Sequence, residues 1–130
     1  MRPIYDGIKI VFCPILNENI TFNARGYYHL QHDIHGNGRD PKTRIHKLSL
    51  IPLTVPVIKI ATSVDEEREE WVQLERKKGA KKVRVRYIAL VADVGKKSNV
   101  RVRVVLIRPE GSQKTIFWSA MRLKITKKAP

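Results

Sequence analysis

The sequence predicts an α+β protein in which two N-terminal helices pack on a four-stranded antiparallel β-sheet. Two observations carry this prediction. The helical segments lie in the first half of the chain, and the second half alternates apolar and polar residues between short turn-like connections. With 130 residues, of which 42% are hydrophobic and 29% charged, the chain has the size and composition of one globular domain. We therefore expect a single domain over residues 1–130.

The first half of the chain supplies one strand and two helices. Residues 7–13 are rich in β-branched side chains and predict a short strand. Residues 20–22 are expected only as a short extension that leads into the first helix. That helix is predicted over residues 24–34, with Asn23 as its N-cap. A second helix is predicted over residues 43–53 and is ended by two prolines.

The middle of the chain predicts an extended segment followed by a charged connection. Residues 55–61 predict a strand or extended segment. Residues 63–71 predict a capped helix, because their acidic side chains would lie near the favourable N-terminal end. We expect the carboxylates of residues 65–70 on a solvated face or, alternatively, in an acidic flap that faces the basic region. Residues 75–82 predict a solvated hairpin or loop.

The second half predicts a meander of three strands. The strands are expected over residues 83–94, 100–108 and 114–125, separated by residues 95–99 and 109–113, which have the composition of hairpin turns. Short connections make neighbouring strands antiparallel. Valines and arginines alternate along these strands, so we expect one apolar face on the helices and one face that presents a grid of arginines.

The net charge indicates the kind of partner. The chain carries 26 Lys and Arg against 12 Asp and Glu, a formal net charge of +14. The excess lies in residues 76–130, which hold 17 basic and 2 acidic residues. Such a basic region attracts a polyanion, either nucleic acid or an anionic membrane surface. The single cysteine, Cys13, excludes a disulfide framework and a paired-cysteine zinc site, and the N-terminus lacks the apolar region of a signal peptide, so we expect a cytoplasmic protein.

The histidines are the candidate catalytic groups. His29 and His32 are three residues apart and share a helix face with Asp33 nearby, which is a spacing that can hold a metal ion. The chain has no HExxH motif and no glycine-rich nucleotide loop. Metal-free RNA cleavage needs less: a base for the 2′-hydroxyl, an acid for the leaving 5′-oxygen, and cations for the phosphorane. Histidine and arginine supply these functions at neutral pH.

Four segments in this order resemble the BECR (Barnase–EndoU–colicin–RelE-like) superfamily of ribonucleases, in its phage-associated and toxin branch. They are Asn19-Ile20-Thr21, Tyr28-His29-Leu30-Gln31-His32, the apolar run over residues 50–56, and Ile116-Phe117-Trp118-Ser119. The resemblance covers about residues 18–120. It implies two early helices, a four-stranded antiparallel sheet, and RNA cleavage without a metal or other cofactor. It also implies a histidine on the early helix, basic residues on the sheet, and a hydroxyl residue on the last strand.

Carried onto this chain, the resemblance implies a catalytic set of His29, His32, Arg103 and Ser119. Several members place a catalytic carboxylate on a central strand, whereas here only Asp93 lies on the meander, so we expect a site centred on histidine or arginine. The residues expected to bind RNA are Arg39, Arg84, Arg86, Arg101, Lys114 and Trp118.

The leading hypothesis is therefore a metal-independent endoribonuclease that acts as a toxin or mobile-element effector. Its partners would be RNA and an acidic antitoxin or immunity protein, with no membrane involved. Two alternatives remain: a non-catalytic RNA- or DNA-binding module that uses the basic sheet, and a metal-dependent nuclease built on the histidine cluster.

Overall fold

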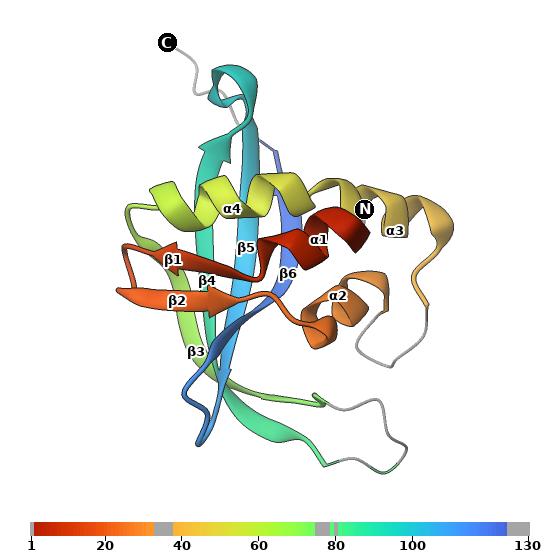
Figure 1. Ribbon diagram of the computed structural model, residues 1–130, viewed down its shortest axis with the longest axis vertical. Helices are drawn as coiled ribbons and strands as arrows, with labels where there is room; N and C mark the ends of the chain where they lie inside the picture. Colours follow the sequence, from red (N-terminus) through yellow and green to blue (C-terminus); the bar gives the residue numbers. More distant parts are fainter. Residues whose placement is uncertain (1, 33–37, 75–78, 80, 125–130) are drawn as a thin grey trace.

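The computed structural model describes residues 2–32, 38–74, 79 and 81–124. Four helices and six strands lie in these ranges (Figure 1). The helices are α1 (Arg2–Ile8), α2 (Ala24–Gln31), α3 (Pro41–Ser49) and α4 (Ile51–Ile60), and a short 3-10 turn, η1, covers Lys96–Ser98. The strands are β1 (Ile10–Cys13), β2 (Glu18–Thr21), β3 (Val64–Val72), β4 (Val83–Val94), β5 (Val100–Pro109) and β6 (Thr115–Leu123).

The strands form one six-stranded mixed sheet, and the predicted four-stranded antiparallel sheet is wrong. The strand order is β1-β2-β6-β5-β4-β3. The three meander strands are confirmed as β4, β5 and β6, but β2 pairs in parallel with β6 through Ile20 and Thr21, opposite Thr115 and Ile116. Residues 20–22 are too few to show the alternation of a strand. The strand could not be predicted locally, because it forms by pairing with residues about 95 positions away in sequence.

The second predicted helix is in fact two helices, and the predicted strand over residues 55–61 is wrong. This segment belongs to α4, which starts at Ile51 with Pro52 in its first turn. Proline is tolerated there, because the first N–H groups of a helix have no intrahelical partner. The buried residues Ile51, Thr54 and Val57 follow the helical period.

No helix within the described ranges is long and apolar enough to cross a bilayer.

The predicted helix over residues 63–71 is also wrong, because this acidic segment forms strand β3. This strand pairs antiparallel with β4 from Val64 to Val72. In a solvated helix the backbone groups bond only within the helix, and the carboxylates have no basic partners on a neighbouring strand. As strand β3 the segment forms backbone hydrogen bonds with β4, and most of its carboxylates form ion pairs with arginines. The acidic strand therefore faces the basic strands, as the acidic-flap alternative expected.

Two cores lie on opposite faces of the sheet. In the main core, α4 packs across β4 and β5, and α1 and α2 lie beside it (Figure 1). Its sheet residues include Val104 and Leu106. The intervening Val105 and Ile107 point to the other face and join a smaller core that includes Trp118.

This division also splits the predicted arginine grid between the two faces. In the continuous register of β4 and β5, Arg101 and Arg103 pair with Asp93 and Val91 on the face of the smaller core. Arg86 pairs with Arg108 on the opposite face. The alternation was read correctly within each strand, but the two segments have opposite phases because their valines belong to different cores.

Candidate active site

The free edge of β6 is the place where the predicted catalytic helix meets the sheet. Strand β2 pairs only with the first two residues of β6, and α2 packs against β6 beyond them. Gly26 allows this close approach, because a Cβ atom there would overlap the carbonyl oxygen of Phe117 and lie 2.9 Å from the Tyr5 hydroxyl. Asn23 is confirmed as the N-cap of α2, since its side chain accepts hydrogen bonds from the backbone N–H groups of Arg25 and Gly26. The helix is thus fixed at its start and pressed onto β6.

His29 is held against Trp118 by two contacts. The imidazole stacks on the indole, with ring centroids 4.3 Å apart and planes 24° apart, and its Nδ1 lies 3.1 Å from the backbone oxygen of Trp118. A carbonyl oxygen only accepts hydrogen bonds, so Nδ1 carries the proton and donates it. The neutral ring therefore has its lone pair on Nε2, as a general base requires.

The surroundings of His29 keep it neutral. Burial, with the nearby positive charges of Arg39 and Lys47, lowers the pKa of His29 from 6.5 to about 4, although the hydrogen bond to Trp118 opposes this shift. At pH 7 the imidazole is accordingly an unprotonated base.

A β-bulge in β6 positions Trp118 and Ser119. Ser119 pairs with Val105 and Phe117 pairs with Leu106, so Trp118 is an extra residue between them. In such a bulge two residues oppose one partner, and the strand bends locally. Trp118 is 8% exposed and part of the smaller core, so it packs and supports His29. Ser119 is partly exposed, one residue beyond the carbonyl that holds His29.

Two cationic side chains, Arg39 and Lys47, lie near His29, and a third, Arg44, lies beside Gly38. Arg39 donates from Nε to the carbonyl of Leu30 at 3.1 Å and, more weakly, from Nη2 to the carbonyl of His29 at 3.4 Å. Lys47 donates from Nζ to the carbonyl of Ala120 at 2.8 Å. The Nε of Arg44 is buried and has no hydrogen-bond partner in the described part of the chain.

Arg39 and Lys47 repel each other. Burial and the charge of Arg39 lower the pKa of Lys47. Within the described ranges, no carboxylate forms an ion pair with Arg39, Arg44 or Lys47. An anion would relieve both the repulsion and the missing hydrogen bond. Sequence reasoning missed Arg44 and Lys47, although their spacing of three residues already placed them on one face of the second predicted helix.

His32 lies close in sequence to His29 but faces a different group. Its Nδ1 is 2.9 Å from the backbone oxygen of Tyr28, and its ring stacks on the Tyr28 ring at 3.7 Å between centroids. By the same argument Nδ1 carries the proton. His32 therefore caps the end of α2 and is not turned towards β6.

The structure does not bring Arg103 to His29. The side chain of Arg103 is 23% exposed, and its guanidinium reaches across β4 to the β3 carboxylates Asp65, at 3.1 Å, and Glu66, at 2.5 Å. Arg103 thus points away from β6.

The other predicted RNA-binding arginines of the sheet are also paired with carboxylates. Arg84 bonds Glu69 of β3. Arg101 bonds Asp93 at 2.7 and 3.1 Å. Arg86 bonds Glu67 of β3 and lies 3.8 Å from Glu18 of β2. Lys114 is exposed in the β5–β6 connection.

Metal binding finds little support in the described ranges. No three His, Cys, Asp or Glu side chains come close enough there to hold a metal ion. Asp33, which was considered as a ligand beside His29 and His32, lies outside the described residues.

Comparison with family models, with curated proteins and with solved structures gave no match for this chain.

Proposed function

We propose that the protein is a metal-independent endoribonuclease whose base is His29. The observation that carries the proposal is a neutral imidazole with Nδ1 bound to Trp118, surrounded by cations that no described carboxylate neutralises. A general base and unpaired positive charge are the two requirements for phosphoryl transfer from a 2′-hydroxyl.

In the proposed reaction the 2′-oxygen attacks the adjacent phosphorus. His29 Nε2 takes the 2′-hydroxyl proton while the 2′-O–P bond forms. The P–O5′ bond breaks, and the leaving 5′-oxygen takes a proton from the Lys47 ammonium. The products are a 2′,3′-cyclic phosphate and a 5′-hydroxyl end.

Lys47 suits the role of proton donor because burial and Arg39 lower its pKa, which makes its ammonium a stronger acid. Arg39 and Arg44 would stabilise the negative charge on the phosphorane. Ser119 would hydrogen-bond a phosphate oxygen beside the bulge.

The proposed partners follow from this chemistry. RNA is the substrate, which implies action in the cytoplasm. A toxin of this kind needs an acidic antitoxin or immunity protein to cover the cationic site, and electrostatic attraction would drive that association. The effector role and this partner are part of the proposal.

The test is incubation with end-labelled RNA in EDTA. We expect the wild-type protein to produce 2′,3′-cyclic phosphate ends. His29→Asn keeps a side-chain N–H in place to donate to the Trp118 carbonyl but removes the base, so cleavage should fall by a factor on the order of 10² to 10⁴. Lys59→Gln, on the exposed last turn of α4, is the control and should cleave like the wild type.

Three results would contradict the proposal. Equal cleavage by His29→Asn and wild type would remove His29 from the reaction. RNA that stays intact but shifts on a gel would identify a non-catalytic binding module, and cleavage only after addition of a divalent metal would favour a metal-dependent nuclease.

A further inference from the structure

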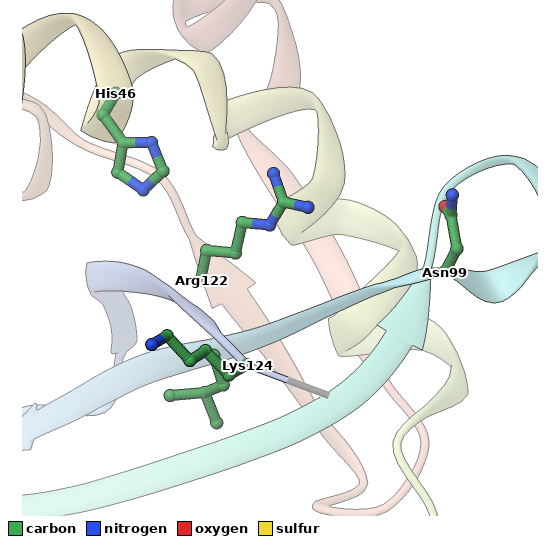
Figure 2. Close-up of a pocket in the computed structure, with 5 residues that line it drawn as sticks. His46, Asn99, Arg122 and Lys124 are labelled. Atoms are coloured by element: carbon green, nitrogen blue, oxygen red, sulfur yellow. The ribbon is translucent and has the colours of Figure 1, made fainter. Parts of the chain in front are cut away.

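A cationic cavity lies at the C-terminal end of β6. It has a volume of about 490 Å³ and is lined by His46 of α3, Asn99 before β5, and Arg122, Leu123 and Lys124 at the end of β6. Figure 2 shows His46 and Lys124 on one side of the cavity, Asn99 on the other, and the Arg122 side chain between them. This volume falls within the range of roughly 300–1,000 Å³ that is usual for small-molecule sites, so the cavity can hold a nucleotide unit.

The lining is suited to an anion. Arg122 and Lys124 are positively charged, and no carboxylate among the described residues lines the cavity. Neither side chain forms an ion pair with another residue in the described ranges. This distinguishes them from the arginines of β4 and β5, whose charges are offset by carboxylates. The amide of Asn99 adds a donor and an acceptor.

The cavity lies beyond two side-chain contacts along β6. His29 contacts the carbonyl of Trp118, and Lys47 contacts that of Ala120. Arg122 follows Ala120 by two residues, and it pairs with Val102, which faces the main core. At about 3.3 Å per residue, Trp118 and Arg122 are separated by about 13 Å along the strand, which is longer than one phosphodiester group but within the reach of a short oligonucleotide.

We propose that this cavity is a second phosphate-binding subsite, which holds the RNA strand at a nucleotide beyond the phosphodiester that is cleaved at His29. The inference rests on the proposed function for the identity of the strand. The guanidinium of Arg122 and the ammonium of Lys124 contact a backbone phosphate there, and α3 connects the two subsites because it carries both Lys47 and His46.

The test measures binding without cleavage. The ligands are fluorescently labelled 2′-O-methyl oligonucleotides, which lack the 2′-hydroxyl nucleophile, as a hexamer and a dimer. We expect Arg122→Gln to weaken hexamer binding about tenfold and to weaken dimer binding much less. The slope of log K against log[salt] for the hexamer should become shallower by about 0.7, the value for one phosphate contact on a single strand. Arg122 is exposed, so its substitution leaves the fold intact.

Lys124→Gln provides a second variant with the same expected direction, and Lys59→Gln is the matched control for the loss of one charge. Hexamer affinities of Arg122→Gln and Lys124→Gln that equal that of Lys59→Gln would overturn the subsite. Equal losses for hexamer and dimer would also overturn it, because the cavity would then hold no additional phosphate.

The cleavage assay keeps this inference separate from the proposed function. RNA cleavage by the wild type together with hexamer binding that does not depend on Arg122 would reject the subsite alone. Intact RNA together with Arg122-dependent hexamer binding would reject the nuclease and keep the subsite.

Discussion

At the scale of single residues, the state of His29 depends on three neighbours with opposing effects. The Trp118 carbonyl favours the protonated ring, whereas burial and the charges of Arg39 and Lys47 disfavour it. Burial and the two charges together outweigh the carbonyl, so the pKa of His29 is lowered. The His29 imidazole therefore stays unprotonated near pH 6.5, where a free histidine is half protonated. A phosphate bound among these cations would raise this pKa again, which would favour proton transfer only when substrate is present.

This balance predicts a pH-dependent stability. Between pH 6.5 and about 4 the unfolded chain binds a proton at His29 that the folded protein does not, so the free energy of unfolding falls as the pH falls through this window. His29→Asn does not titrate. The stability of the wild type relative to this variant should therefore decrease by up to about 3 kcal/mol from pH 7 to pH 4.

Urea unfolding of both proteins at several pH values measures this difference. Because the carboxylates titrate in both proteins, their contribution cancels in the comparison. A constant difference across the range would mean that His29 is not desolvated as described.

At the scale of elements, the site depends on how closely α2 approaches β6. The edge of a sheet exposes unpaired backbone groups, and covering it with a helix is one way to protect it. Here side chains of the helices also bond backbone carbonyls of that edge, because His29 of α2 and Lys47 of α3 both donate hydrogen bonds to carbonyls of β6. The same contacts that protect the edge also position the proposed base and acid.

Gly26→Ala is the substitution that tests this docking. Its Cβ would meet the backbone of Phe117, which cannot give way as a side chain can. We expect a loss of about 3 kcal/mol in the free energy of unfolding and a loss of RNA cleavage, as α2 moves away from β6.

Gly7→Ala in α1 is the matched control, since its Cβ would meet nothing within 4 Å. Alanine is favoured over glycine in a helix by up to about 1 kcal/mol, so this variant should be as stable as the wild type or more so. Denaturant unfolding measures both variants, and equal stabilities for the two would contradict the close approach.

At the scale of the whole molecule, the positive charge is not spread as the composition suggests. Strand β3 places its carboxylates beside the arginines of β4 and β5, and Glu18 of β2 contributes a bridge to Arg108 at 2.9 Å. Solvent-exposed pairs of this kind add little stability, typically below about 1 kcal/mol each. Their larger effect is to reduce the positive field over the sheet, while the cations of α3 and the end of β6 keep no carboxylate partner in the described ranges.

Removing the acidic partners should therefore strengthen RNA binding. Glu67→Gln with Glu69→Gln removes the β3 partners of Arg86 and Arg84 and raises the net charge by two. We expect the affinity for the uncleavable hexamer to rise several-fold at low salt and its salt dependence to become steeper. Anisotropy titrations at three salt concentrations measure both, and an affinity equal to or weaker than that of the wild type would contradict this account of β3.

Part of this molecule could be predicted from the sequence because it depends on local pattern. The meander of β4, β5 and β6, the cap at Asn23 and the histidine helix that follows it are encoded by residues near one another in the chain. The alternation of valine and arginine also indicated strands, and the spacing of His29 and His32 predicted that both lie on the same helix.

The remainder was decided by contacts between distant segments. The acidic residues of β3 have a helix-like arrangement of charge, but pairing with β4 and the arginines outweighs that preference. The parallel pairing of β2 with β6 and the split of the arginines between two faces follow from which apolar residues each core buries. The order of residues along the chain was enough to predict a histidine helix and a basic meander. That His29 contacts Trp118 near Lys47, while Arg103 turns to β3, follows from the folded structure, because burial and long-range charge pairing are properties of the folded chain.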